Sequence, residues 1–201
     1  MHIVEQEIAH TIAVYRKFQE DRELIAVVNG IGEACAQALQ SGHKILVAGN
    51  GGSAADAQHI SAEFVSRFTV DRVPLPAIAL TTDTSILTAC GNDYGFETVF
   101  SRQVQALGCE GDIFIGISTS GKSPNVIRAM EAARAKRMIT VALTGERTTE
   151  LSQFCDYVAR VPSGRTQNIQ EVHIMIAHTI CAIAERSFLP GKSPSQDSGD
   201  A

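Results

Sequence analysis

The hydrophobic positions near the start of the chain recur at the spacing of amphipathic helices. A first helix is expected from a set of apolar residues on one side, at Ile8, Ile12, Val14, Tyr15 and Phe18. The pattern breaks near Asp21 and resumes in a second expected helix, whose apolar positions are Leu24, Val27, Val28, Ile31, Ala34, Cys35 and Leu39. Ser41-Gly42 ends this helix, because glycine is the usual residue just past a helix.

Beyond residue 41, short apolar runs alternate with longer segments of helical character. The apolar runs have the length of buried strands, and we expect them at Lys44–Ala48, Pro76–Leu80, Asp112–Ser118, Met138–Thr144 and Tyr157–Val161. Helices are expected near Ala54–Ser66, Asp83–Cys90, Glu97–Leu107, Pro124–Lys136, Thr149–Phe154 and Asn168–Phe188. This alternation predicts right-handed crossovers and a parallel sheet, which is an α/β fold.

These elements are expected to form one domain over residues 1–189. It consists of the N-terminal helices at 1–41 and an α/β core at 42–189. The last residues, 190–201, are small and polar, so we expect a disordered tail there.

Composition and charge limit the class of protein. The 201 residues suffice for one domain with a substantial core, 44% of them are hydrophobic, and the net charge of −5 argues against a nucleic-acid partner. No apolar run reaches the roughly 18 residues of a membrane span, and the N-terminus lacks the pattern of a signal peptide. The five cysteines form no C-x-x-C pair, so we expect no disulfide framework, no thiolate zinc site and a cytoplasmic location.

The segment Lys44–Phe64 is typical of a strand, a glycine-rich turn and a helix that together bind a ligand. The glycines of GNGGSA allow a sharp turn and a close approach of the backbone to a ligand. The N–H groups at the start of the helix favour an anion or a sugar oxygen. His59 and Glu63 lie four residues apart and therefore share one face of this helix.

Two other interpretations of this segment remain open at this point. GNGGSA also fits the dinucleotide pattern G-x-G-x-x-A, although the second strand is followed by Thr81-Thr82 rather than an acid, and Asp83 opens the next helix. A histidine and a glutamate four residues apart are also commonly a solvated pair without a ligand.

A second loop of ligand-binding character follows the third expected strand. It carries four hydroxyl side chains, at Ser118, Thr119, Ser120 and Ser123, and Pro124 suits the first turn of the next helix. Hydroxyl and backbone N–H donors at a helix start are suited to phosphate. In an open parallel sheet, ligands bind beyond the carboxyl ends of the strands, which is where this loop is expected.

The letters GISTSGKS in this loop also match the nucleotide-binding pattern G-x-x-x-x-G-K-[ST]. However, Gly116 lies inside the apolar strand rather than at its end, and no other expected strand ends in a clear magnesium-binding aspartate. We therefore favour a phosphate monoester over a nucleotide. A serine-rich capping turn without a ligand is the alternative.

Four segments taken together, AGNGGSAADAQHISAEF, TACGNDYGFETVF, GISTSGKSPN and IQEVHIMIAH, resemble the sugar isomerase (SIS) domain family, and within it the phosphoheptose isomerases. The resemblance extends to about Phe188. It implies a three-layer α/β sandwich with a five-stranded parallel sheet flanked by helices, assembled as a homotetramer in which the N-terminal helices pack. It also implies isomerisation of sedoheptulose 7-phosphate to D-glycero-D-manno-heptose 7-phosphate, the first step toward the nucleotide-activated heptose of bacterial surface polysaccharides.

The same resemblance assigns roles to individual residues. It makes Glu63 the catalytic base and His178 the catalytic acid. A zinc site described for some members corresponds to His59, Glu63, Gln170 and His178. The positions that match sugar- and phosphate-binding residues are Asn50, Gly51, Gly52, Ser53, Asn92, Asp93, Ser118, Thr119, Ser120, Ser123 and Gln170. Just before Gln170 the chain departs from many members, because Arg165-Thr166-Gln167-Asn168 replaces a segment that carries an acid.

The chemistry of an aldose–ketose isomerase agrees with these roles. A proton must move between adjacent carbons through an enediol, so the site needs a carboxylate near carbon and an acid near oxygen, as Glu63 and His178 can provide. A zinc ion can polarise the carbonyl, but zinc-bound Glu63 has fewer lone pairs free to act as a base. Metal and base functions therefore compete at this residue.

Helix geometry predicts that the site lies between subunits. Gln170 and His178 are eight residues apart on one helix, about 12 Å along its axis and roughly 80° around it, so one metal is hard to reach from both. We expect one of them to come from a neighbouring subunit. His173, between two apolar residues, is expected to be a packed histidine instead.

The competing function is that of the non-catalytic relatives in this family. These bind phosphosugars and contact the replication initiator DnaA. They lack the complete catalytic pair, whereas Glu63 and His178 are both present here. We expect no nucleic-acid and no membrane partner.

Overall fold

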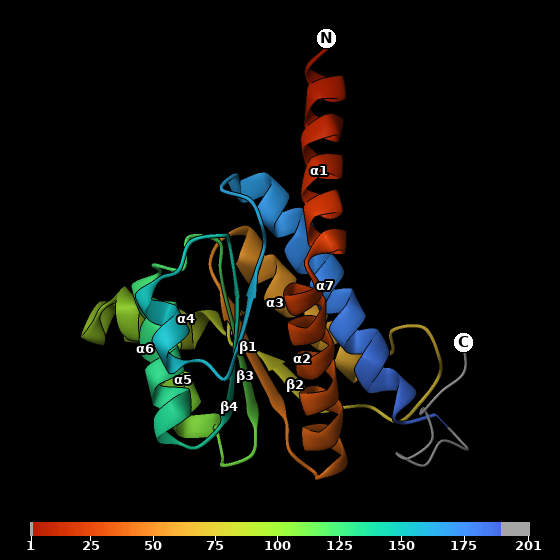
Figure 1. The fold of residues 1–201 in the computed structure, drawn as a ribbon. Helices are drawn as coiled ribbons and strands as arrows, with labels where there is room; N and C mark the ends of the chain where they lie inside the picture. The colour runs from red at the N-terminus through yellow and green to blue at the C-terminus, as the bar shows by residue number, and fades with distance from the viewer. Residues whose placement is uncertain (1, 190–201) are drawn as a thin grey trace.

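The computed structural model describes residues 2–189 and contains one parallel sheet with helices on both faces (Figure 1). The strands are β1 (Ile45–Gly49), β2 (Ala77–Ala79), β3 (Ile113–Ser118), β4 (Ile139–Thr144) and β5 (Tyr157–Arg160). The five strands are ordered β2-β1-β3-β4-β5, and each neighbouring pair is parallel. The expected α/β fold with a five-stranded parallel sheet is confirmed.

The helices form the two outer layers of a three-layer sandwich. One layer contains α1 (Ile3–Glu20), α2 (Arg22–Gln40), α3 (Gly52–Val65) and α7 (Thr166–Arg186), and the other contains α4 (Thr84–Tyr94), α5 (Ser101–Leu107) and α6 (Pro124–Ala135). Ile45 and Val47 of β1 belong to the apolar core under α2, α3 and α7. Leu46 and Ala48 point the opposite way and belong to the core under α5 and α6. Each face of the sheet therefore has its own core.

Helix α1 extends beyond the rest of the molecule (Figure 1). Val14 is its only buried residue within the described part of the chain. Its exposed apolar side chains are Ile3, Val4, Ile8 and Ile12, which are 77%, 68%, 54% and 46% exposed. A helix that leaves such a row of apolar side chains in water is suited to packing against another molecule.

The predicted break between the first two helices lies at Asp21. Asp21 ends α1 and also caps α2, because its side chain accepts a hydrogen bond of 2.9 Å from the backbone N–H of Leu24. This is the usual way in which an aspartate satisfies a free N–H group at the start of a helix. Asp83 caps α4 in the same manner through Ile86, as the sequence indicated.

The helix expected at Glu97–Leu107 is not continuous. A 3₁₀ helix, η1 (Phe96–Thr98), precedes it, and α5 begins only at Ser101. Val99 and Phe100 lie between them and are almost completely buried in the core, which bends the chain toward the sheet at that point. The prediction of one helix was wrong because this local burial overrides helical periodicity.

Several other boundaries also differ from the prediction. The segment expected as a helix at Thr149–Phe154 is a short 3₁₀ helix, η2 (Glu150–Phe154), which buries only Leu151. Helix α4 continues to Tyr94 rather than ending at Cys90, and stops at Gly95, whose φ of 90° is incompatible with a continued right-handed helix. Helix α7 begins at Thr166, before the expected Asn168.

The strand order places the two predicted ligand loops side by side. From β1 the chain goes through α3 to β2 on one side, and β3 lies on the other side of β1. Gly49, the last residue of β1, is paired with Ile117, one residue before the end of β3. The carboxyl ends of two such strands form the crevice in which open α/β sheets bind ligands.

Of the helices described, none is long and apolar enough to cross a membrane. The tail expected at 190–201 lies outside the described residues.

Candidate active site

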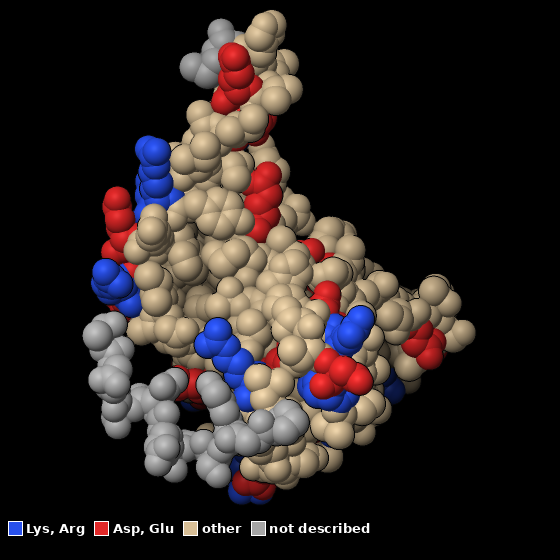
Figure 2. All heavy atoms as spheres, turned by 90° about the vertical axis from the view of Figure 1, so that its right-hand side faces the viewer, with Lys and Arg blue, Asp and Glu red and all other residues tan. Residues whose placement is uncertain are grey.

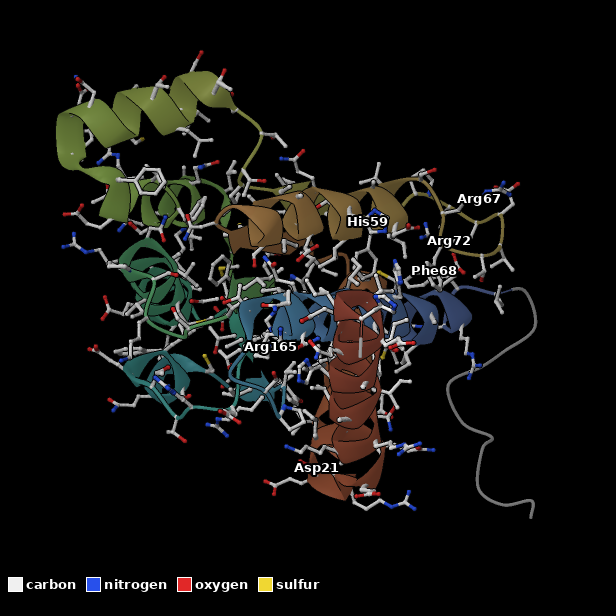
Figure 3. All side chains as sticks on the ribbon, turned by 90° about the horizontal axis from the view of Figure 1, so that it is seen from above. Asp21, His59, Arg67, Phe68, Arg72 and Arg165 are labelled. Carbon is white, nitrogen blue, oxygen red and sulfur yellow. The ribbon has the colours of Figure 1, made fainter. Side chains whose placement is uncertain are left out.

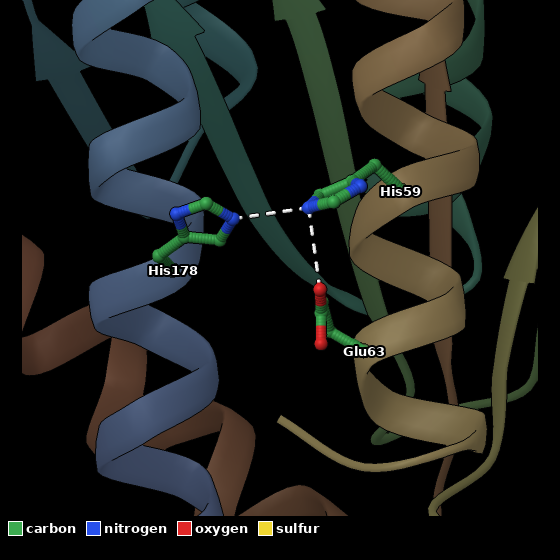
Figure 4. Close-up of side chains that lie close together, drawn as sticks. All are labelled: His59, Glu63 and His178. Carbon is green, nitrogen blue, oxygen red and sulfur yellow. Dashed lines mark hydrogen bonds and ion pairs between the residues drawn. The ribbon is translucent and has the colours of Figure 1, made fainter. Parts of the chain in front are cut away.

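Three polar side chains from two helices meet in one cluster (Figure 4). Nε2 of His59 on α3 lies 3.0 Å from Nε2 of His178 on α7 and 3.2 Å from Oε1 of Glu63. His59 and Glu63 thus share one face of α3, as their spacing predicted. One ligand atom from each of the three residues lies within 4.8 Å of the others, so a single ion or a single polar ligand atom could contact all three.

The loop after α3 forms one wall beside this cluster. The ring of Phe68 lies 5.5 Å from the ring of His178, centroid to centroid. Arg72 donates hydrogen bonds of 2.8 Å to the backbone carbonyls of Glu63 and Phe64, which ties the loop to the end of α3. Figure 3 shows Phe68 and Arg72 together beyond His59, next to α7. The position of Phe68 therefore depends on how this loop is held.

A buried carboxylate at the end of α7 holds the same loop. Glu185 accepts hydrogen bonds from the backbone N–H groups of Phe68, Thr69 and Val70, and from the Thr69 hydroxyl at 2.6 Å. Arg72 lies 3.3 Å from its carboxylate, and both side chains are almost completely buried. Burial alone raises the pKa of Glu185, but the hydrogen bonds from Thr69, Phe68 and Val70 more than offset it and leave that pKa below its usual value. No spacing in the sequence marked Glu185 or Phe68 as part of the site.

One further acid lies on the face of α3 that carries the cluster. Asp56 precedes His59 by three residues, and its buried Oδ2 has no hydrogen-bond partner among the described residues. Burial raises the pKa of Asp56, and the nearby His59 partly lowers it. The i, i+3 spacing to His59 was the signal from which Asp56 could have been recognised.

The turn after β1 has the compact geometry that the glycines predicted. Gly51 adopts a φ of 58°, and Ser53 at the start of α3 is 3% exposed. Gly52 faces Gln170 on α7, because a Cβ at Gly52 would overlap Nε2 of that side chain. Gln170 therefore lies at the start of α3, two turns before His59, whereas His178 reaches His59 directly. Within one chain the structure brings together three of the four expected zinc ligands, His59, Glu63 and His178. The fourth, Gln170 on α7, lies beside the start of α3 instead, away from the other three.

The hydroxyl loop after β3 also has a defined shape. The Oγ atoms of Ser118 and Ser123 are 2.9 Å apart. Ser118 is the last residue of β3, and Ser123 directly precedes α6. Thr119 and Ser120 line a pocket of about 180 Å³. The opposite wall of this pocket comes from the loops after β4 and β5 and the start of α7, with Glu146, Arg147, Ser163, Gly164 and Thr166.

The match to a nucleotide-binding loop is explained by packing. Gly116 lies in the middle of β3, and a Cβ there would come within 2.9 Å of Met130 and Val126 on α6. Glycine is needed at this position so that α6 can pack closely on the sheet, rather than to wrap a diphosphate. This supports the preference for a phosphate monoester over a nucleotide.

Asn92 and Asp93 are not brought to the cluster. They lie at the end of α4, in the outer layer opposite α3 and α7, and they hydrogen bond to each other at 2.7 Å. His173 is buried, as expected of a packed histidine, and its Nε2 donates to the carbonyl of Thr144 at 3.1 Å. Burial lowers the pKa of His173 to about 4, so the imidazole is neutral.

The segment that departs from the family pattern contacts α1. Arg165 donates to both carboxylate oxygens of Glu7, at 2.8 and 2.9 Å, and these hydrogen bonds lower the pKa of Glu7. Asn168 is buried and donates to Thr11 at 3.0 Å and to Glu171 at 3.1 Å. In this chain the segment 165–168 therefore fixes α1 to the start of α7.

The fold and site together define a class of protein. A family model described as the SIS domain matches residues 9–145, from the middle of α1 to the end of β4. Four of the five strands (β1 to β4), the glycine turn after β1 and the hydroxyl loop after β3 all lie in this matched range.

Comparison with individual proteins identifies the family within this class. The phosphoheptose isomerase of Burkholderia pseudomallei (strain K96243) is 54% identical over 185 residues, which make up 92% of this chain and 94% of that protein. The structure of phosphoheptose isomerase GmhA from Neisseria gonorrhoeae matches with a TM-score of 0.84 at 44% identity, over 91% of this chain and 97% of that one. A phosphoheptose isomerase structure from Francisella tularensis matches with a TM-score of 0.85 at 38% identity, over 92% and 100% of the two chains. The chain belongs to the phosphoheptose isomerases of the SIS domain family.

Proposed function

We propose that this chain converts sedoheptulose 7-phosphate to D-glycero-D-manno-heptose 7-phosphate in the cytoplasm, as the first step toward a nucleotide-activated heptose for surface polysaccharide. The observation that carries the proposal is the meeting of Glu63, His59 and His178, because it combines a carboxylate and imidazoles as an enediol mechanism requires. The high identity to phosphoheptose isomerases supports the choice of substrate.

Glu63 and His178 divide the proton transfers between carbon and oxygen. Glu63 removes a proton from C1 of the ketose and returns it to C2 of the enediol, which converts the ketose into the aldose. His178 donates a proton to the C2 oxygen and takes up the proton that the C1 hydroxyl loses, which restores its starting state. Phe68 beside His178 covers one side of the cluster with an apolar ring, which helps to keep water from the enediol.

The phosphate is assigned to the loop after β3. Thr119 and Ser120 line the pocket there, and Ser118 and Ser123 hold the two ends of the loop together at the start of α6. Free N–H groups at a helix start add to the attraction of a phosphate dianion. The sugar then extends toward the turn after β1, where Asn50, Gly51, Gly52, Ser53 and Gln170 are assigned to it.

The cluster has the chemistry of a zinc site. Two imidazole nitrogens and one carboxylate oxygen, from His59, His178 and Glu63, are a usual catalytic ligand set for this ion. When bound, zinc supplies polarisation of the substrate carbonyl. Gln170 would complete the site only by a change of side-chain position or from a neighbouring subunit.

We infer that the working form is a homotetramer of single-domain chains, residues 1–189, with active sites at the interfaces. The exposed apolar row of α1 supports this inference. Uncharged residues make up most of the face that carries α1 and α7, with charged side chains toward its margins (Figure 2). Asn92 and Asp93, which lie in the opposite layer of their own chain, would then contact the sugar bound to a neighbour.

The proposal is tested by following sedoheptulose 7-phosphate by NMR in D₂O. Wild-type protein should form the manno-heptose phosphate with solvent deuterium at C2, and Glu63→Gln should slow turnover by about 10²- to 10⁴-fold. Glu131→Gln makes the same chemical change on the exposed face of α6 and serves as the control. Binding of the sugar phosphate without turnover by the wild-type protein would instead support the non-catalytic function.

A further inference from the structure

Two asparagines join the turn after β1 to the start of α6. Nδ2 of Asn50 donates to Oδ1 of Asn125 at 2.9 Å, and Nδ2 of Asn125 donates to Oδ1 of Asn50 at 2.8 Å. The pair is therefore reciprocal, with two hydrogen bonds closing a ring between two side-chain amides. Asn50 directly follows β1, and Asn125 is the second residue of α6, just after the hydroxyl loop.

Packing of α6 against the sheet makes this pair possible. Gly116 in β3 has no side chain to hold α6 away, and Val126, next to Asn125, is fully buried against it. Asn125 is itself 2% exposed, although it carries a polar amide. A buried amide requires hydrogen-bond partners, and Asn50 provides the partners of Asn125.

The two amides differ in whether their unused hydrogen-bonding groups can reach a ligand. A side-chain amide has two N–H donors and two acceptor lone pairs, and the reciprocal pair uses one of each from both residues. Asn125 is buried, so its remaining groups do not face solvent. Asn50 is only half-buried and keeps one N–H and one lone pair free on the side of the ligand crevice.

We propose that Asn125 is a positioning residue for the sugar. It fixes the plane of the Asn50 amide, so that the free N–H and lone pair of Asn50 point at sugar hydroxyls. It also holds the sugar-binding turn at a constant separation from the phosphate loop. The proposal rests on the isomerase function proposed above and adds Asn125, which touches no substrate itself, to the groups that determine how substrate binds.

This role predicts a particular kinetic result. In Asn125→Ala, Asn50 loses two hydrogen bonds and rotates freely, so the sugar binds without a fixed contact while the phosphate loop is intact. We expect kcat/KM for sedoheptulose 7-phosphate to fall about tenfold, mainly through KM, as for the loss of a hydrogen bond that orients a binding group. Inhibition by inorganic phosphate, which needs only the loop, should change less than about twofold.

The test is a double-mutant cycle with Asn50→Ala, Asn125→Ala and the double variant. If Asn125 acts through Asn50, the second substitution costs less than about twofold in kcat/KM once Asn50 is absent. Gln37→Ala removes an amide from the exposed face of α2 and controls for general effects. If Asn125→Ala does not fold, Asn125→Asp replaces it, because the carboxylate still accepts from Asn50 but cannot donate to it.

The outcomes separate this inference from the proposed function. Equal losses from Asn125→Ala in the presence and absence of Asn50, or full activity in the variant, overturn the positioning role while the isomerase stands. A wild-type protein that does not turn over sedoheptulose 7-phosphate overturns both.

Discussion

The Nε2 atoms of His59 and His178 face each other at 3.0 Å, although 119 residues separate them in the chain. Helices α3 and α7 pack side by side on the same face of the sheet, and this packing sets the distance. Since the Glu63 carboxylate lies 3.2 Å from the same atom of His59, the donor atoms of all three residues converge on one small volume. The arrangement leads directly to a prediction about metal binding.

We expect the protein to bind zinc through this cluster, and His178→Gln to weaken binding by roughly 100-fold. This estimate divides an apparent zinc-binding free energy of about 10 kcal/mol or more among three or four ligands. Competition with a chromophoric chelator measures the affinity without reference to activity. His43→Gln, which alters a half-buried histidine beside Asp112, is the matched control, and equal affinities in the two variants would contradict the assignment.

The apolar row on α1 predicts that oligomerisation depends on this helix. Ile12→Glu places a charge among the exposed apolar side chains and should lower the mass measured by light scattering after gel filtration, with the helix content unchanged. Leu107→Glu, at the exposed end of α5, is the control. A monomeric Ile12→Glu variant with full activity would show that the active site needs no neighbouring subunit.

Gly52 is predicted to be required for the position of Gln170 rather than for stability. In Gly52→Ala the new Cβ displaces the end of the Gln170 side chain, which can move without disturbing the backbone. We expect the free energy of unfolding, measured in urea, to change by less than about 1 kcal/mol, and kcat/KM to fall. Gln170→Ala should cause a similar fall, and combining the two changes should cause no further loss; additive losses would mean that Gly52 acts on the substrate in another way.

His173 predicts a loss of stability in mild acid. Its pKa is about 4 in the folded protein, below the usual 6.5, because burial disfavours the charged imidazolium. The unfolded chain therefore takes up a proton first as the pH falls. The stabilisation is complete above about pH 6.5 and declines toward pH 4, by roughly 3 kcal/mol in total. His173→Gln should show a flatter dependence of unfolding free energy on pH in this range, and parallel curves for variant and wild type would contradict the assignment.

The sheet could be predicted from the sequence because its central strands β1, β3 and β4 are buried on both faces along almost their whole length. The strand Ile113–Ser118 is buried throughout and apolar up to its last residue, and this pattern leaves little choice of structure. The helical segment at 97–107 could not be predicted in detail, since the bend depends on Val99 and Phe100 fitting into a core formed by distant residues. Apolar periodicity records which side chains are buried but does not record where the chain turns to bury them.

The same distinction applies to the site. The proximity of His59 and Glu63 could be predicted from the sequence, because a separation of four residues on a helix fixes their relative position. The contacts of Asn125 and Glu185 could not be predicted, because their hydrogen-bond partners lie 75 and at least 115 residues away and only the packed structure brings them together. The resemblance to a family supplied His178, which the sequence pattern alone would assign to the core.

Through Glu185, the last turn of α7 holds the loop that forms one wall of the site. Helix ends are the first part of a helix to fray, and this end carries the carboxylate that binds the backbone of residues 68–70. Fraying would release Phe68 from His178 while the sheet and its two cores remain folded. On heating, enzymatic turnover should therefore be lost at a lower temperature than secondary structure.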